Sequence, residues 1–301
     1  MTSEMRLLIL PILLVVSTGL YAQEKTAAFG RVDALALRIP DSQARTTQGI
    51  SNYVTSNFTS QTDRSRAIFV WVATSIQYDI DNMFAVNFYQ GTDEIIKDVL
   101  SKRKGVCQHF AELYNEIANK SGIKTYVIAG YTKQNGSVDY LPHAWCASLI
   151  DSAWYLIDPT WGSGYIYNSK FIRKINNDYF KAKPEKMISS HMPFDPLWQF
   201  LNYPLTSQEF YQGRTAMNTS RPYFNFRDTL KSYEQESRID RLIASRRRIE
   251  QNGVRNSLVS DRMQHIIREV DYYHDSIRVE RYNSAVYHYN DGINHLNRFI
   301  D

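Results

Sequence analysis

Cys107, His143 and Asp158 are the side chains whose types and places in the sequence best suit nucleophilic chemistry. Cys107 lies two residues after Gly105, at the predicted start of an amphipathic helix, where free N–H groups and the helix dipole favour a thiolate. His143 opens a predicted strand, and Asp158 ends the next one across a tight turn at 151–152. A thiol, an imidazole and a carboxylate are the parts of a triad in which the carboxylate orients the imidazole and the imidazole serves the thiol.

The turn sets how close the imidazole and the carboxylate come. If Asp151–Ser152 is the turn, the numbers of paired residues sum to about 303, and His143 lies opposite roughly residue 160. Asp158 is then a diagonal neighbour on the same face of the hairpin. We expect the carboxylate to accept the Nδ1–H of the imidazole, which leaves Nε2 for the thiol.

A zinc site and a disulfide are two other possible roles for these residues, and helix and strand geometry disfavours both. Cys107 and His109, together with His143 and Cys146, have the residue types of a zinc site. Residues two apart on a helix, or three apart on a strand, point in different directions, which disfavours one tetrahedral centre. A Cys107–Cys146 disulfide is disfavoured in the same way, because Cys146 points away if His143 faces the helix. A cysteine in an apolar helix is commonly just a small buried hydrophobe, so spacing alone leaves the catalytic and the packing interpretations open.

Helices, then strands, must position these side chains. Apolar residues at helical spacing predict helices within residues 23–60, over 63–76 with Asp63 as N-cap, over 93–100, and from Cys107 to Ser121-Gly122. After Gly122 the period changes to two, which predicts strands over 125–131, 143–150 and 154–158. A helix followed by hairpin strands indicates the α+β class.

The C-terminal third returns to helical spacing. Prolines interrupt residues 166–215, and from about residue 224 apolar residues recur at helical intervals, with a break at 251–253. We therefore expect residues 23–215 to form a catalytic domain and 216–301 a helical hairpin module. The apolar stripe Val259, Met263, Ile266 and Val270 is expected to be buried, with Arg262 and Arg268 toward solvent. A tyrosine-rich surface that recruits a partner is the alternative for this segment.

Composition narrows the protein class. The chain has 301 residues, 43% of them hydrophobic and 22% charged, which excludes a disordered or low-complexity chain. A formal charge of +4 is too small to indicate a nucleic-acid partner. Two cysteines cannot provide a disulfide framework. No apolar run beyond the N-terminus approaches the roughly 18 residues that a membrane span requires.

Residues 1–22 have the pattern of a secretory signal peptide. A short segment ending at Arg6 precedes an apolar run over Leu7–Val16, and small residues lead to a cleavage site after Ala22. The run is short for a membrane anchor, which is the alternative. We expect an exported protein, periplasmic or extracellular. Because oxidising compartments normally pair or remove free thiols, a cysteine that persists there suggests a role.

Three stretches around the candidate residues resemble the motifs of the transglutaminase-like superfamily. They are Gly105-Val106-Cys107 before a helix, Pro142-His143-Ala144-Trp145, and Trp154-Tyr155-Leu156-Ile157-Asp158-Pro159-Thr160-Trp161-Gly162. The resemblance covers roughly residues 63–163 and implies a cysteine-protease-like, papain-like fold with Cys107 as nucleophile, His143 as base and Asp158 as its orienter. Residues 179–199 also resemble an extension found in bacterial transglutaminase-like and kyphoscoliosis-peptidase-like proteins.

Residues near the motifs are candidates for the substrate cleft. Trp145 and Trp161 flank the triad and suit cleft walls, with core packing as an equal alternative. Tyr78 or Gln108 is a candidate second oxyanion donor beside the backbone N–H of Cys107. His191 is a candidate substrate-side group, although an ordinary hydrogen-bonded histidine is favoured.

The expected activity is thiol-dependent acyl transfer on amide bonds, with hydrolysis favoured over crosslinking. The chain lacks the paired Cys-x-x-Cys motifs of peptide N-glycanases and any acidic loop like the calcium sites of animal transglutaminases. We therefore expect no metal and no cofactor. The expected substrate is a protein, a peptide or a cell-wall peptide, and the sequence leaves the oligomeric state open. The alternative function is a catalytically silent binding or scaffolding protein of the cell envelope.

Overall fold

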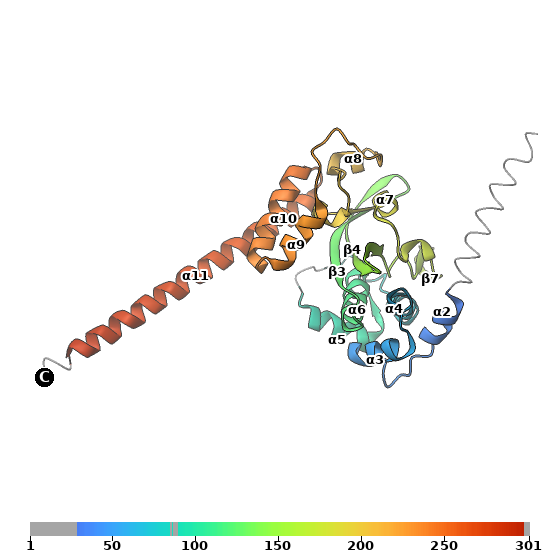
Figure 1. Ribbon diagram of the computed structural model, residues 1–301, viewed down its shortest axis with the longest axis horizontal. Coiled ribbons are helices and arrows are strands. Elements are labelled where there is room, and N and C mark those ends of the chain that lie inside the picture. Colours follow the sequence, from blue (N-terminus) through green and yellow to red (C-terminus); the bar gives the residue numbers. More distant parts are fainter. Residues whose placement is uncertain (1–28, 85, 87–89, 298–301) are drawn as a thin grey trace, which may run out of the picture. The chain divides into compact units, whose positions relative to one another are not determined.

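Helices dominate the chain before the sheet, as the apolar spacing predicts. The computed structural model describes residues 29–84, 86 and 90–297, so the predicted signal peptide lies outside the described residues. The helices that precede the sheet are α2 (Gly30–Ala36), α3 (Thr47–Asn57), α4 (Gln61–Ser75), α5 (Thr92–Lys102) and α6 (Cys107–Lys120) (Figure 1). Among the described residues, no helix combines the length and the apolar character that a membrane crossing requires.

Helix α6 is the central element of this part of the fold. It contacts α3, α4, α5 and strand β3 (Thr125–Gln134). Phe110, Leu113, Tyr114 and Ile117, which recur at helical spacing, are completely buried. A helix that is packed on several sides holds its first residue, Cys107, in a fixed place.

Helix α4 begins earlier than the sequence predicts. Its N-cap is Ser60, whose hydroxyl accepts the backbone N–H of Asp63 at 3.0 Å. The prediction of Asp63 as N-cap is therefore wrong. Asp63 lies in the first turn, where the partial positive charge of the helix start favours a carboxylate, and serine and aspartate both suit a helix start.

A four-stranded sheet follows α6. Its strands are β3, β4 (Ser137–Ile150), β5 (Ala153–Ile157) and β8 (His191–Pro193), in the order β5-β4-β3-β8. Strands β4 and β5 are antiparallel and pair Cys146 with Ile157. This pairing confirms the register expected from a turn at Asp151 and Ser152, both of which have positive φ, as tight hairpin turns require. Strand β4 begins at Ser137, ahead of the predicted start at His143.

Two small sheets complete the first part of the chain. Strand β1 (Gln77–Tyr78) pairs in parallel with β2 (Lys104–Gly105), just before α6. Strands β6 (Gly164–Tyr167) and β7 (Lys170–Arg173) form an antiparallel hairpin. Short helices η1 (Asn177–Tyr179), α7 (Pro184–Met187), η2 (Pro196–Gln199) and α8 (Ser207–Tyr211) occupy the proline-interrupted region.

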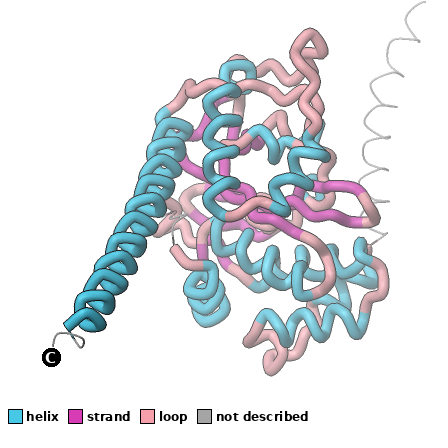
Figure 2. The backbone as a smooth tube through the Cα atoms, turned by 60° about the vertical axis from the view of Figure 1, so that its left-hand side comes forward, coloured by secondary structure: helices cyan, strands magenta, loops and turns pink. Residues whose placement is uncertain are grey.

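The described residues after about residue 224 are mostly helical, as predicted. The chain divides into one unit made of residues 1–135 and 141–191, and a second made of 136–140 and 192–301. The second unit contains α9 (Phe226–Gln235), α10 (Arg238–Asn252) and α11 (Ser257–Asn297), so three helices follow residue 224 within the described chain. Figure 2 shows α11 as an unbroken helix that continues to the grey C-terminal residues.

The apolar stripe of α11 is buried in part. Val259 and Ile266 are buried, whereas Met263 and Val270 are half-buried. Arg268 is exposed, as expected, and Arg262 is half-buried. Helix α10 contacts α11, so the two helices form the expected pair. These elements confirm the α+β class with a helical C-terminal segment.

Candidate active site

The start of α6 holds Cys107 in an unusual local arrangement. The N-cap residue Val106 is extended, and its N–H donates to Nδ1 of His109 at 3.3 Å. A side chain on Gly105 would bring its Cβ within 2.6 Å of the His109 Cβ. Glycine at this position therefore lets the imidazole of His109 fold back over the helix start. Helix geometry leaves the first N–H groups, including that of Cys107, without an intrahelical acceptor.

Strand β1 brings Tyr78 to the same place. Tyr78 pairs with Gly105, and the N–H of Asp79 donates to the carbonyl of Gly105 at 2.9 Å. Burial, and then the negative charges of Cys107 and Asp158, raise the pKa of Tyr78 above its ordinary range. The phenol therefore stays protonated and remains an O–H donor close to the thiol.

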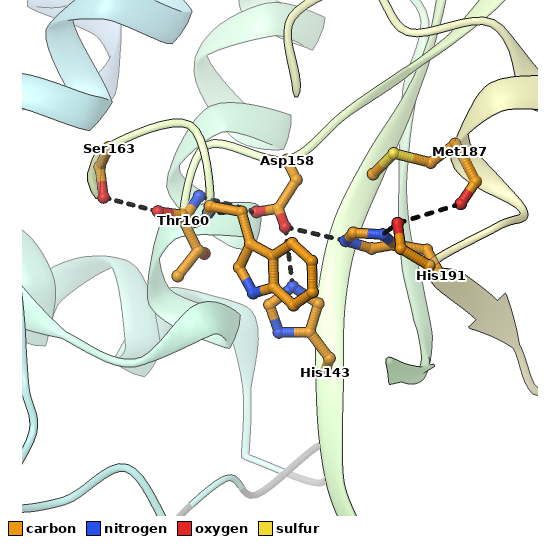
Figure 3. Close-up of polar contacts among 8 residues, drawn as sticks. His143, Asp158, Thr160, Ser163, Met187 and His191 are labelled. Carbon is orange, nitrogen blue, oxygen red and sulfur yellow. Dashed lines mark hydrogen bonds and ion pairs between the residues drawn. The ribbon is translucent and has the colours of Figure 1, made fainter. Parts of the chain in front are cut away.

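His143 connects the thiol to the carboxylate. Its Nε2 lies 2.8 Å from Oδ2 of Asp158, on the hairpin of β4 and β5 (Figure 3). The nitrogen differs from the expected Nδ1, because strand register fixes where the ring starts and not which edge it presents. Burial opposes the imidazolium, but the charges of Asp158 and Cys107 and hydrogen bonds to both raise the pKa of His143 to about 10.

Asp158 is completely buried, and its carboxylate accepts four hydrogen bonds. Oδ1 accepts the backbone N–H groups of Thr160 at 2.8 Å and Trp161 at 3.1 Å. Oδ2 lies 2.8 Å from Nε2 of His143 and 3.1 Å from Nε2 of His191. Burial opposes the carboxylate, but the charge and hydrogen bond of His143, and then the bond from His191, hold the pKa of Asp158 well below its ordinary value.

His191 is the residue whose place in the site the sequence does not predict. Its side chain is completely buried, and its Nδ1 lies 2.8 Å from the hydroxyl of Ser190. It is hydrogen-bonded at both nitrogens, in keeping with the favoured expectation, but one partner is the carboxylate of Asp158. The signal available in the sequence was its inclusion in the extension motif at 190–199, 33 residues after Asp158.

Aromatic rings enclose the two imidazoles. Trp161 and Trp145 lie edge-to-face with His191 at centroid distances of 4.6 and 5.1 Å, and Trp145 stacks with His143 at 6.0 Å. Trp145 is completely buried, so it lies behind the histidines, whereas Trp161 is half-buried. The aromatic shell excludes water from the imidazole–carboxylate bonds and strengthens them.

The structure also locates the other residues singled out from the sequence. Gln108 is buried in the first turn of α6. Both cysteines are free, but the expectation that Cys146 points away from the helix is wrong, because its thiol faces α6. Cys146 donates its S–H to the carbonyl of Ala111 at 3.3 Å, and burial raises the pKa of its thiol. His109 has Val106 and Asp98 as neighbours instead of the other residues of the zinc alternative.

His143, Asp158 and His191 also have the donor types of a metal site. One ligand atom from each lies within 4.8 Å of the others. The separations of 2.8 and 3.1 Å fit N–H···O hydrogen bonds to one shared oxygen. A metal ion here would require both Nε2 atoms to be deprotonated and would take His143 away from the thiol.

Comparison with known proteins agrees with this arrangement. Residues 48–159 match the model of the transglutaminase-like superfamily. Kyphoscoliosis peptidase of the mouse, Mus musculus, is 30% identical over 162 residues, which are 50% of this chain and 24% of that protein. Cytokinesis protein 3 of Saccharomyces cerevisiae is 22% identical over 161 residues, 51% of this chain and 17% of that protein. The chain thus spans about a quarter or less of the length of these relatives.

Solved structures show the same kind of likeness. A structure described as a TGase is 22% identical with a TM-score of 0.31, covering 55% of this chain and 42% of that one. The periplasmic domain of TgpA from Pseudomonas aeruginosa is 20% identical with a TM-score of 0.31, covering 43% and 47%. Residues 48–159 are thus similar to the transglutaminase-like superfamily, in agreement with the resemblance of the three sequence motifs.

Proposed function

We propose that the protein is a cysteine hydrolase that cleaves amide bonds through Cys107, His143 and Asp158. The observation that supports this most is the pair of partners on His143. Asp158 binds one nitrogen of the ring, and the other partner of the ring is Cys107. A buried imidazolium between a carboxylate and a thiolate is the arrangement that an acyl-transfer cysteine needs at neutral pH.

The reaction uses each group in turn. The thiolate of Cys107 attacks the amide carbon and forms a tetrahedral oxyanion. As the C–N bond breaks, the imidazolium of His143 gives its proton to the leaving nitrogen, and a thioester remains. Water then attacks the thioester while His143 takes a proton from it, and collapse releases the carboxylic acid and restores the thiolate–imidazolium pair.

Donors at the start of α6 stabilise the oxyanion in this proposal. The backbone N–H of Cys107 has no intrahelical acceptor, and the phenol of Tyr78 keeps its proton because burial and nearby negative charge raise its pKa. We favour Tyr78 over Gln108 as the second donor, because Tyr78 pairs with Gly105 and its phenol interacts electrostatically with Cys107. Loss of one such donor typically costs about 100-fold in turnover.

The substrate class follows from the proposed location. A signal peptide at residues 1–22 would export the protein to the periplasm or beyond, where proteins, peptides and cell-wall peptides are available. Water is the acceptor that needs no binding site of its own, so we propose hydrolysis in preference to transamidation. The mouse relative is named as a peptidase, which agrees with this choice.

A catalytically silent binding or scaffolding protein is the second candidate. The observation that favours it is burial, because Cys107 is 3% and His143 is 7% exposed. A substrate would have to open this region before the thiol could attack. The two functions differ in whether the thiol of Cys107 reacts.

Alkylation separates the two candidates. Iodoacetamide at neutral pH should modify Cys107 much faster than Cys146, whose pKa is raised by burial. Peptide mass spectrometry assigns each modified site, and Cys146→Ser is the matched control that should leave the rate unchanged. Slow labelling of both cysteines, or a Cys107→Ala variant that folds and retains full function, would eliminate the hydrolase proposal.

A further inference from the structure

We propose that His191 is a positioning residue, whose Nε2–H holds Oδ2 of Asp158 at the point where it receives the Nε2–H of His143. This inference rests on the proposed function of Cys107. It extends the triad by a second imidazole that acts through the carboxylate of Asp158. Two observations support it: both ring nitrogens of His191 have hydrogen-bond partners, and tryptophan rings pack against the imidazole.

The backbone fixes where His191 enters the site. The N–H of Lys133 in β3 donates to the carbonyl of Ser190 at 2.8 Å, immediately before His191 begins β8. The ring of Trp161 packs edge-to-face on the imidazole at 4.6 Å. The imidazole therefore has little freedom to turn away from Asp158.

The ionised state of Asp158 determines which atom is the donor in each of these hydrogen bonds. Asp158 is ionised, so both Nε2 atoms that approach its Oδ2 must carry the proton. In the neutral ring, Nδ1 of His191 is then an acceptor, and the Ser190 hydroxyl is the donor that fits, because Nδ1 lies 2.8 Å from it whereas its other acceptor, the carbonyl oxygen of Met187, lies 3.4 Å away. Ser190 thereby selects the tautomer of His191 that donates to the carboxylate.

The carboxylate of Asp158 has no spare acceptor site. A carboxylate offers about four lone-pair positions, and two backbone N–H groups and two imidazoles occupy them. Because Asp158 and the side chain of His191 are completely buried, bulk water is not at hand to replace a lost donor. Without His191, Oδ2 loses one of its two restraints, and the carboxylate can rotate about its bonds to Thr160 and Trp161. His143 would then lose the fixed acceptor that aims its other nitrogen at Cys107.

Two substitutions of His191 separate positioning from packing. His191→Phe keeps an aromatic ring of similar size and removes the donor, whereas His191→Gln keeps a side-chain N–H donor. The measured quantity is the second-order rate constant for alkylation of Cys107 by iodoacetamide, assigned by mass spectrometry. We expect His191→Phe to lower it about tenfold or more, the change for one lost hydrogen bond to a charged group. His191→Gln should restore most of the rate.

Phe180→Leu is the control for stability. Phe180 is buried in the same unit and packs against Phe69 and Phe29. Its truncation should lower the melting temperature and leave the alkylation rate near that of the wild type. The proposal is overturned if His191→Phe reacts like the wild type, or if His191→Gln and His191→Phe lose reactivity equally.

The alkylation experiments distinguish failure of the role proposed for His191 from failure of the proposed hydrolase function. If the wild-type thiol of Cys107 reacts no faster than a free cysteine, the hydrolase proposal itself fails. If His191→Phe does not fold, Ser190→Ala tests the inference, since it leaves the imidazole in place and removes its hydroxyl partner. Ser190→Ala should lower the rate by less than His191→Phe would, and an unchanged rate would overturn the role of His191.

Discussion

Asp158 shows how a buried carboxylate can stay ionised. Burial alone would raise its pKa, but the charge and hydrogen bond of His143, and then those of His191, lower the pKa instead. The same interaction raises the pKa of His143. The carboxylate and the imidazolium therefore stabilise each other, and each makes folding depend on pH.

The Asp158–His143 pair should stabilise the folded protein most in mildly acidic solution. The folded pKa of Asp158 is lower than its ordinary value of 3.8, so its contribution is present above pH 3.8 and is lost as pH falls further. The folded pKa of His143 is raised from 6.5 to about 10, so its contribution is full below pH 6.5 and is lost as pH rises toward 10. Denaturant unfolding at several pH values measures both slopes.

Asp158→Asn isolates the pair from the other ionisable groups of the chain. The amide oxygen can still accept the N–H groups of Thr160 and Trp161, but the negative charge beside His143 is gone. The fall in the free energy of unfolding between pH 6.5 and about 10 should become shallower than in the wild type. Identical pH dependence in the two proteins would contradict the assigned ion pair.

The sequence predicts which residues meet at the site better than it predicts which of their atoms form the hydrogen bonds. The hairpin register places His143 and Asp158 together, because strand pairing follows from a two-residue turn. It does not predict that Nε2 meets the carboxylate, since that depends on side-chain torsions. The contact between His191 and Asp158 has no local signal, because β8 has three residues and pairs only within the folded sheet.

At the scale of elements, the junction of β2 and α6 determines the setting of the thiol. Gly105 pairs with Tyr78, and the absence of its side chain lets His109 approach the helix start. His109 accepts the N–H of Val106, so the imidazole caps the helix one residue before Cys107. Gly105 therefore influences the setting of the Cys107 thiol, the capping of α6 and the place of Tyr78, a candidate oxyanion donor.

Gly105→Ala should impair both stability and reactivity. The added Cβ would meet the Cβ and Cγ of His109 at 2.6 and 2.7 Å, so the imidazole or the helix start must move. We expect a loss of about 1–3 kcal/mol in the free energy of unfolding and slower alkylation of Cys107. Gly30→Ala is the control, since nothing lies within 4 Å of its new Cβ. A variant at Gly105 that matches this control in both measurements would contradict the role of the junction.

Elements with a long periodic pattern are predicted well, and short ones are not. Helices α3, α4, α5 and α6 and the β4–β5 hairpin follow from apolar spacing and turn residues. Strand β4 extends beyond the segment that its apolar pattern predicts. Hydrogen bonding between strands continues through residues in which apolar and polar side chains do not strictly alternate. Strands β1, β2 and β8 have two or three residues, too few for any period to appear.

At the scale of the whole molecule, the chain divides after His191. Residues 192–215, which the sequence analysis groups with the catalytic segment, cluster with the C-terminal helices. The contacts within this second unit explain the grouping. Trp198 packs on Tyr233 of α9 at 5.1 Å, and Phe200 packs on Phe226 at 5.9 Å.

A buried ion pair ties the same segment to α10. Arg248 donates to both carboxylate oxygens of Asp195, with Nε to Oδ1 at 2.8 Å and Nη2 to Oδ2 at 2.7 Å. Both side chains are largely buried. Removal of one partner from such a pair leaves an uncompensated charge, at a cost of about 3–5 kcal/mol. The helices after residue 224 are therefore part of the folding unit that begins at Met192.

Two truncations test this dependence. A chain that ends at residue 223 loses Phe226, Tyr233 and Arg248, which leaves Trp198, Phe200 and Asp195 uncovered, so it should aggregate and melt at a lower temperature. A chain that ends at Asp271 retains all of these contacts and loses residues 272–301, whose described side chains are almost all exposed, so it should keep the melting temperature of the full chain. Light scattering, thermal unfolding and the alkylation rate of Cys107 are measured for both. If the chain ending at 223 remains monomeric, equally heat-stable and fully reactive, the C-terminal helices fold as an independent module, and the alternative of a tyrosine-rich recruiting surface gains support.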